Sequence, residues 1–273
     1  MSSLRCNTKG NGVRLASEHL GEGGDAPLVI AHGLLGAGRN WGALAKRLAK
    51  RRKVIVADLR GHGDSPWSDD VSYPAMAGDL AETIGAEAGG RADVLGHSMG
   101  GKVAMTLALA QPSRLRKLIV ADVAPVVYDH SHADTLAAMA ALDLSRITRR
   151  ADADRALRDS IPNAALRAFV AQNLAIEDGA ARWRPDIAAL AAGMPGLVGF
   201  PAHFAHDSFA GPALFLRGGA SDYVTPAMHG AIRARFPAAR IETLEGAGHW
   251  LHAEQPEAFL AAVEAFLTGD RAP

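Results

Sequence analysis

The sequence predicts an α/β protein in which a mostly parallel sheet carries helices on both faces and receives a helical lid insertion. Short apolar runs alternate with amphipathic helical stretches from residue 28 to residue 122, as in parallel strands joined by covering helices. The alternation stops where alanine-rich helical stretches are broken by prolines, and it resumes near residue 212. We therefore expect a core formed by residues 1–124 and 211–273, with a helical lid at residues 125–210.

The individual elements follow from the spacing of apolar residues. Two short strands joined by a Gly-Asn-Gly turn are expected to form an antiparallel edge, at Leu4–Thr8 and Val13–Glu18. Buried strands are expected at residues 28–32, 54–58, 92–95, 117–122, 212–216 and 240–244. Helices are expected at residues 40–50, 74–88, 102–110, 227–235 and 256–267.

Composition narrows the class of protein. The 273 residues include 29 Lys+Arg and 29 Asp+Glu. The chain therefore lacks the net positive charge that would indicate a nucleic acid as its partner. The single cysteine, Cys6, excludes an intramolecular disulfide and a multi-cysteine metal site. We find no signal-peptide pattern and no apolar stretch of about 18 residues, which predicts a cytoplasmic protein without a membrane span. The oligomeric state is expected to be a monomer or a homodimer.

A Gly-x-Ser-x-Gly turn follows the strand at residues 92–95, with Gly96 and Gly100 on either side of Ser98. Glycine at both flanks lets strand and helix approach closely enough to hold the serine in strained backbone geometry. The hydroxyl then stands clear of the sheet, at the positive end of the following helix. This context predicts that Ser98 is a nucleophile.

A serine nucleophile needs a base within hydrogen-bond reach and a third group that orients the base. His249 is the candidate base, because it lies in a glycine-rich loop between the last strand and the last helix. In a doubly wound sheet this loop opens at the same edge as Ser98. Asp122 and Asp222 both follow strands at that edge, so either residue is a candidate for the triad acid.

The oxyanion of a tetrahedral intermediate also needs hydrogen-bond donors. The backbone amides of Leu34 and Met99 are the expected donors, since Gly33 and Gly36 leave the main chain around Leu34 free to point inward and Met99 begins the helix after Ser98. We expect substrate contacts from Gly33, His97 and Trp250, and consider one from His62 as well. The lid is expected to line an acyl pocket, with Met139, Phe169, Leu174, Met194 and Phe204 as candidates.

Several motifs are spread over nearly the whole chain: His32–Gly36, Asn40–Trp41, Asp58–Ser65, Gly96–Lys102, Asp122–Pro125, Gln172–Leu174, Arg182–Arg184 and Ala247–Trp250. Together they resemble the α/β-hydrolase family and, within it, the YbfF-type bacterial esterases. The resemblance implies a Ser-His-Asp carboxylester hydrolase for short- to medium-chain acyl esters or acyl thioesters, with no metal or organic cofactor. Members of this type can lack an aspartate at the position of Asp222 and take the acid from the position of Asp122. This chain has both residues, so the choice stays open.

Two other functions compete with this interpretation. His130, His132 and Asp134 form an H-x-H-x-D string in the lid, which His203 and His206 could join to bind zinc in a metal-assisted hydrolase. A non-catalytic small-molecule receptor on the same fold is the second alternative, because a fold does not determine a function.

Overall fold

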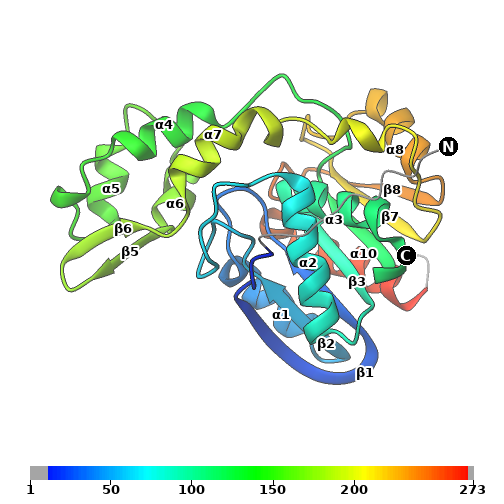
Figure 1. Cartoon of the computed structure of the whole chain (residues 1–273). Helices are drawn as coiled ribbons and strands as arrows, with labels where there is room; N and C mark the ends of the chain where they lie inside the picture. The colour runs from blue at the N-terminus through cyan, green and yellow to red at the C-terminus, as the bar shows by residue number, and fades with distance from the viewer. Residues whose placement is uncertain (1–11, 270–273) are drawn as a thin grey trace.

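A six-stranded sheet forms the centre of the computed structural model, which describes residues 12–269 (Figure 1). Its strand order is β2-β1-β3-β4-β7-β8. The strands are β1 Ser17–Ala31, β2 Arg52–Ala57, β3 Ala92–His97, β4 Leu115–Ala121, β7 Ala213–Gly218 and β8 Ala239–Leu244. Parallel pairing extends from the end of β1 to β8, so the carboxyl ends of these strands meet at one edge. The predicted fold class is confirmed.

Strand β1 pairs with β2 in both directions. Its last residues, Leu28–Ala31, pair with Val54–Ala57 in ascending order, which is the parallel direction. Its first residues, Ser17–Leu20, pair with the same stretch of β2 in descending order, which is antiparallel. The chain therefore wraps around β2, as the wide blue arc in Figure 1 shows.

This geometry changes the prediction for the beginning of the chain. An antiparallel edge exists, but its strand begins at Ser17 rather than at Val13, and its partner is β2. The expected strand at Leu4–Thr8 lies outside the described residues.

Helices cover both faces of the sheet because each strand supplies side chains alternately to two apolar clusters. In β1, Val29 belongs to one cluster and Ile30 to the other. Helices α2, α3 and α8 pack on the side of Val29, and α1 and α10 pack on the side of Ile30. Their bounds are α1 Gly42–Leu48, α2 Tyr73–Glu87, α3 Met99–Ala110, α8 His229–Arg235 and α10 Pro256–Thr268, with α9 at Leu251–Glu254. Three 3₁₀ helices lie in the connections: η1 Gly38–Trp41, η2 Pro112–Arg114 and η5 Pro226–Met228.

Residues 125–210, which we call the inserted segment, lie between β4 and β7 and gather on one side of the core (Figure 1). Their helices are α4 Ala133–Ala141, η3 Leu144–Arg146, α5 Arg150–Ala156, α6 Ala164–Ala171, α7 Ile187–Leu197 and η4 Ala202–Phe204. An antiparallel hairpin of β5 Leu174–Glu177 and β6 Ala180–Trp183 departs from the all-helical prediction. At its tip Asp178 and Gly179 have φ angles of 50° and 79°, as in a type I′ turn. This Asp-Gly dipeptide is the sequence signal for the hairpin.

The prediction that no apolar stretch reaches membrane-spanning length needs a correction. The 18 residues Ile187–Phe204 have a mean hydropathy of 1.4, and 33% of this window is buried. In the fold, however, α7 ends at Leu197 and η4 begins only at Ala202. A helix of 11 residues is short compared with the ~20 residues that cross a bilayer.

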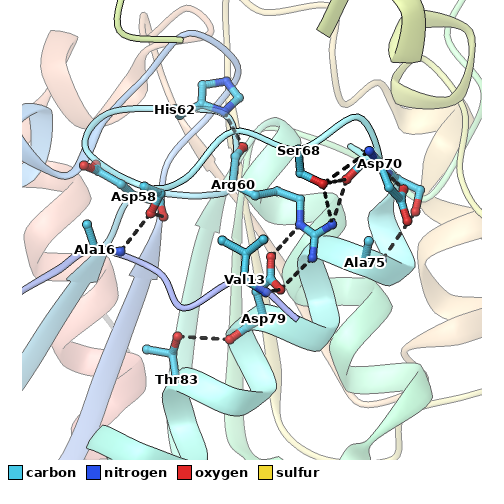
Figure 2. A network of polar contacts seen from close by, with 12 residues as sticks. Val13, Ala16, Asp58, Arg60, His62, Ser68, Asp70, Ala75, Asp79 and Thr83 are labelled. Carbon is cyan, nitrogen blue, oxygen red and sulfur yellow. Dashed lines mark hydrogen bonds and ion pairs between the residues drawn. The ribbon is translucent and has the colours of Figure 1, made fainter. Parts of the chain in front are cut away.

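A buried ion pair fixes the loop that follows β2. Arg60 donates from Nε and Nη2 to both carboxylate oxygens of Asp79 on α2, at 2.6 and 2.7 Å (Figure 2). It also donates from Nη1 to the carbonyl of Asp70 at 2.8 Å. The same loop contacts the inserted segment, whose Asp186 amide donates to the Gly61 carbonyl at 2.9 Å. The loop is thus held between α2 and the inserted segment.

Candidate active site

The turn between β3 and α3 presents Ser98 in strained backbone geometry. Ser98 has φ 50° and ψ −119°, a conformation that L-residues rarely adopt. A Cβ atom at Gly96 would lie 2.2 Å from the Gly100 carbonyl oxygen, and one at Gly100 would lie 2.4 Å from the Ala31 carbonyl oxygen. Strand and helix therefore approach so closely that only glycine fits at both positions. The Ser98 amide donates to the Ala121 carbonyl of β4 at 3.0 Å.

His249 lies between Ser98 and Asp122. Its Nε2 atom is 3.0 Å from Ser98 Oγ, and its Nδ1 atom is 2.8 Å from Asp122 Oδ2. An ionised carboxylate only accepts hydrogen bonds, so the proton of the neutral ring is on Nδ1. The lone pair of Nε2 then faces the serine hydroxyl. This is the arrangement in which an imidazole can accept the hydroxyl proton.

The Asp122 carboxylate is fully buried and held on both oxygens. Oδ1 accepts from the Gly218 amide at 2.9 Å, and Oδ2 accepts from the Ser221 hydroxyl as well as from His249. The backbone of Asp122 has φ 51°, a second strained position at the same sheet edge. Asp222 is exposed, and no hydrogen bond joins it to His249 in the part of the chain that the structure describes. The structure thus brings Asp122, and not Asp222, to the histidine.

Two further side chains fix His249. The Tyr223 ring is stacked on the imidazole, with ring centroids 3.7 Å apart and an interplanar angle of 19°. His97 Nε2 donates to the backbone carbonyl of His249 at 2.9 Å. Burial holds the pKa of His97 well below its ordinary value, so this ring is neutral. His97 also lines a cavity beside Ser98, which is where a substrate-contacting residue was expected.

The amides of Leu34 and Met99 lie beside Ser98. Met99 is the first residue of α3, so its N–H has no partner within the helix. The Leu34 amide donates to no other backbone group among the described residues. The turn that carries Leu34 is closed by the Gly36 amide, which donates to the Gly33 carbonyl at 2.9 Å. A Cβ atom at Gly33 would lie 3.3 Å from Ser98 Cβ, so glycine keeps this turn close to the serine.

Two cavities meet at Ser98. The first has a volume of about 50 Å³ and is lined by Leu34, Tyr73, Met99, Lys102, Val123, Tyr128, His132, Met194, Leu197, Val198 and Tyr223. The second has a volume of about 60 Å³ and is lined by His32–Gly36, Asn40, Trp41, His97, His132, Leu166, Phe169, His249, Trp250 and His252. Leu34 and His132 line both cavities. His249 lines only the second of the two.

The expected pocket residues divide between these cavities and the interior. Met194 lines the first cavity, and Phe169 lines the second, where its ring lies 5.7 Å from that of Trp250. Met139, Leu174 and Phe204 line neither of them and belong to the apolar core of the protein.

His62 does not contact a substrate site either. Its Nδ1 atom donates to the Arg60 carbonyl at 3.0 Å, and the ring packs against His32 with centroids 5.1 Å apart. The ring is fully buried, and burial lowers its pKa to about 3.

Two histidines of the inserted segment, His130 and His132, contact the side chain of Tyr223. His132 Nε2 shares a hydrogen bond of 3.3 Å with the Tyr223 hydroxyl, and the His130 ring packs on the Tyr223 ring at 4.7 Å. Within residues 12–269, no group of three or more His, Cys, Asp or Glu side chains is placed to hold a metal ion. The zinc alternative therefore gains no support from the arrangement of these residues.

Sequence reasoning overlooked Lys102. This lysine is buried in α3, and its Nζ donates to the carbonyls of Val126, Val198 and Gly199 at 3.1, 2.9 and 2.5 Å. Burial lowers its pKa to about 7, whereas three carbonyl acceptors favour the charged form. The signal was present, because Lys102 is the one charged residue in the twelve of α3.

The model of the alpha/beta hydrolase family matches residues 28–262. The chain belongs to that family. The predicted family is thereby confirmed.

Individual relatives extend this match over most of the chain. The Escherichia coli protein named esterase YbfF is 37% identical over 244 residues, covering 89% of this chain and 93% of the relative. The mouse protein named sn-1-specific diacylglycerol lipase ABHD11 is 39% identical over 255 residues, covering 89% of this chain and 82% of the relative. A solved structure described as a marine microorganism esterase has a TM-score of 0.88 and 38% identity, covering 93% of this chain and 99% of that one. The predicted resemblance to YbfF-type esterases is confirmed.

Proposed function

We propose that this protein is a serine carboxylester hydrolase in which Ser98, His249 and Asp122 form the catalytic triad. The observation that carries the proposal is the continuous hydrogen-bonded line from the Asp122 carboxylate through the His249 ring to the Ser98 hydroxyl. The named relatives support the reaction class, since an esterase and a diacylglycerol lipase both cleave carboxylic esters. A carboxylesterase-type enzyme is therefore the function that sequence, geometry and relatives favour together.

The geometry supports a two-step acyl transfer. Ser98 Oγ attacks the ester carbonyl while His249 Nε2 takes its proton, and Asp122 stabilises the imidazolium that forms. The amides of Leu34 and Met99 donate to the oxyanion. His249 then gives the proton to the departing alcohol, and water repeats the sequence on the acyl-enzyme to release the acid.

The position of His249 distinguishes the two cavities. The leaving oxygen must lie within hydrogen-bond reach of His249 Nε2, because this ring protonates it. His249 lines the second cavity, so the alcohol or thiol portion occupies that side. The acyl chain then enters the first cavity, past Met99 towards Met194 and Leu197. Most of the residues that line the first cavity are apolar, as an acyl chain requires.

The inserted segment acts as a lid over this site in our proposal. His132, Met194 and Leu197 all come from it and line the first cavity, while Leu166 and Phe169 line the second. Short- to medium-chain acyl esters are the proposed substrates, and acyl thioesters fit the same chemistry. A cytoplasmic location and a monomeric or homodimeric state stay predictions.

The decisive experiment is intact-protein mass spectrometry after treatment with a fluorophosphonate, on wild type and Ser98→Ala, with a chelator present. A single adduct on the wild type that is missing from Ser98→Ala is expected, together with turnover of p-nitrophenyl esters and a preference for short chains. An unlabelled wild type without ester turnover would refute the proposal and favour a receptor. Turnover that persists in Ser98→Ala would refute the assignment of the nucleophile.

A further inference from the structure

One buried side chain of the inserted segment reaches the Gly33–Gly36 turn. Asn173, 1% exposed between α6 and β5, donates from Nδ2 to the Leu35 carbonyl at 2.8 Å. Leu35 has φ 58°, a left-handed conformation that is costly for a bulky side chain. Such backbone conformations persist where the surrounding structure holds them in place. The hydrogen bond from Asn173, a residue of the inserted segment, stabilises the Leu35 backbone in this way.

Two planar peptide groups connect this contact to the Leu34 amide. The Leu35 carbonyl and the Gly36 amide belong to one peptide group, and the Gly36 N–H donates to the Gly33 carbonyl at 2.9 Å. The Gly33 carbonyl and the Leu34 amide belong to a second group, so the direction of the carbonyl fixes the direction of the Leu34 N–H. Asn173 therefore acts on the Leu34 amide through two successive hydrogen bonds, which polarise one another in a low dielectric.

The Asn173 amide is itself fixed in orientation. Its Oδ1 atom accepts from Arg39 Nη2 at 3.3 Å, and its backbone carbonyl accepts from the Arg184 amide at 2.9 Å. Arg39 also donates to the Gln172 carbonyl at 3.0 Å. A side chain from outside the inserted segment therefore holds both Gln172 and Asn173. With its oxygen directed at Arg39, the amide presents its NH₂ group to Leu35.

We propose that Asn173 is a positioning residue that completes the oxyanion site when the inserted segment is docked on the core. The inference rests on the proposed esterase function and gives the inserted segment a part in stabilising the transition state. Loss of the Asn173 donor should weaken binding of the tetrahedral state much more than binding of the substrate.

The test compares wild type with Asn173→Asp on a short p-nitrophenyl ester. Aspartate has the shape of asparagine and keeps the attraction to Arg39, but it cannot donate to the Leu35 carbonyl. We expect kcat to fall about 10²-fold, the effect of a small misplacement of a catalytic group, with little change in KM. The affinity for an aryl trifluoromethyl ketone, which forms a tetrahedral adduct, should fall in parallel with kcat/KM. Arg39→Met, which frees the amide to rotate, should cause a smaller fall of the same kind.

Asn163→Ala is the matched control, since Asn163 caps α6 through the Leu166 amide at 3.0 Å and has no role in the Gly33–Gly36 turn. Its loss should lower thermal stability without a selective loss of kcat. An active wild type with kcat and ketone affinity unchanged in both Asn173→Asp and Arg39→Met would overturn the inference alone. The same holds if Asn163→Ala lowers kcat as much as Asn173→Asp. If Asn173→Asp does not fold, Arg39→Met decides by the same two measurements, and an inactive, unlabelled wild type would instead refute the proposed function.

Discussion

The ring of Tyr223 lies flat against the ring of His249, with their centroids 3.7 Å apart. The Tyr223 hydroxyl, whose pKa burial raises to about 12, shares a hydrogen bond with His132 of the inserted segment. Tyr223 thus connects His249, the candidate base, to the inserted segment. Its neighbour in the sequence, Asp222, is exposed to solvent and does not reach His249.

Replacement of this ring should impair turnover. Aromatic pairs contribute about 0.5–1.5 kcal/mol beyond simple burial, so Tyr223→Ala should lower kcat by up to about 10-fold through loss of His249 orientation. Tyr223→Phe keeps the stacked ring and loses only the hydroxyl, and it should stay close to wild type. Steady-state kinetics on both variants checks this, and an equal loss in the two would assign the effect to the hydroxyl instead of the stacking.

Substitution of each aspartate should identify the triad acid. Asp122→Asn should lower kcat by about 10⁴-fold, because an amide at this position cannot hold the histidine in the required tautomer. Asp222→Asn should have little effect, since this side chain is exposed. The two variants are compared in kcat at constant pH, with circular dichroism as a check of folding. The opposite ranking would make Asp222 the acid.

Enlargement of the first cavity should move the acyl preference towards longer chains. Leu197→Ala removes an apolar wall of this cavity, and each further buried CH₂ contributes about 0.8 kcal/mol, or roughly 4-fold in kcat/KM. The measurement is kcat/KM over a series of p-nitrophenyl esters of rising chain length. Leu166→Ala is the control, because Leu166 lines the second cavity and should leave the acyl preference as it is. A shift in Leu166→Ala alone would reverse the assignment of the two cavities.

Acid should destabilise the fold through its buried histidines. Burial lowers the pKa of His62 to about 3 and that of His32 to about 4, whereas the unfolded chain titrates near about 6.5. The unfolded state therefore binds more protons below pH 6.5, and stability falls as pH falls. One such histidine contributes a loss of about 2 kcal/mol between pH 7 and pH 5.

His62→Phe should reduce this acid sensitivity by the contribution of one residue. Phenylalanine keeps an aromatic ring against His32 but cannot take up a proton. Urea unfolding at pH 7 and pH 5 measures the difference, with His206→Phe as the exposed control. An unchanged difference between the two pH values would show that His62 is not a source of the acid sensitivity.

Local patterns were sufficient to predict most of the core. Apolar periodicity located the parallel strands, and the spacing of Gly96 and Gly100 around Ser98 predicted a strained turn, because these features depend on neighbouring residues. The choice between Asp122 and Asp222 depends on tertiary contacts, since Gly218 and Ser221 fix the Asp122 carboxylate from another strand end. A sequence pattern does not contain that information.

The inserted segment was harder to predict for the same reason. Its helices bury Met139 and direct Met194 to a cavity, although both residues are apolar and lie in alanine-rich stretches. Packing against the core, rather than periodicity within each helix, decides which face lines the site. The hairpin was not predicted, because its two strands have only four residues each. Four residues are too few to show a clear alternation of apolar and polar side chains.

The bonds of Lys102 have a consequence for engineering this protein. Val126 lies at the entry of the inserted segment, and Val198 and Gly199 lie near its exit, so one ammonium group on the nucleophile helix joins both ends. The segment is thereby a cassette whose entry and exit are tied together at the nucleophile helix, in addition to its contacts with the core through Asn173 and Asp186. A chimaera that exchanges this cassette between relatives should keep its register on the core if it retains the lysine and the two junctions that present these carbonyls.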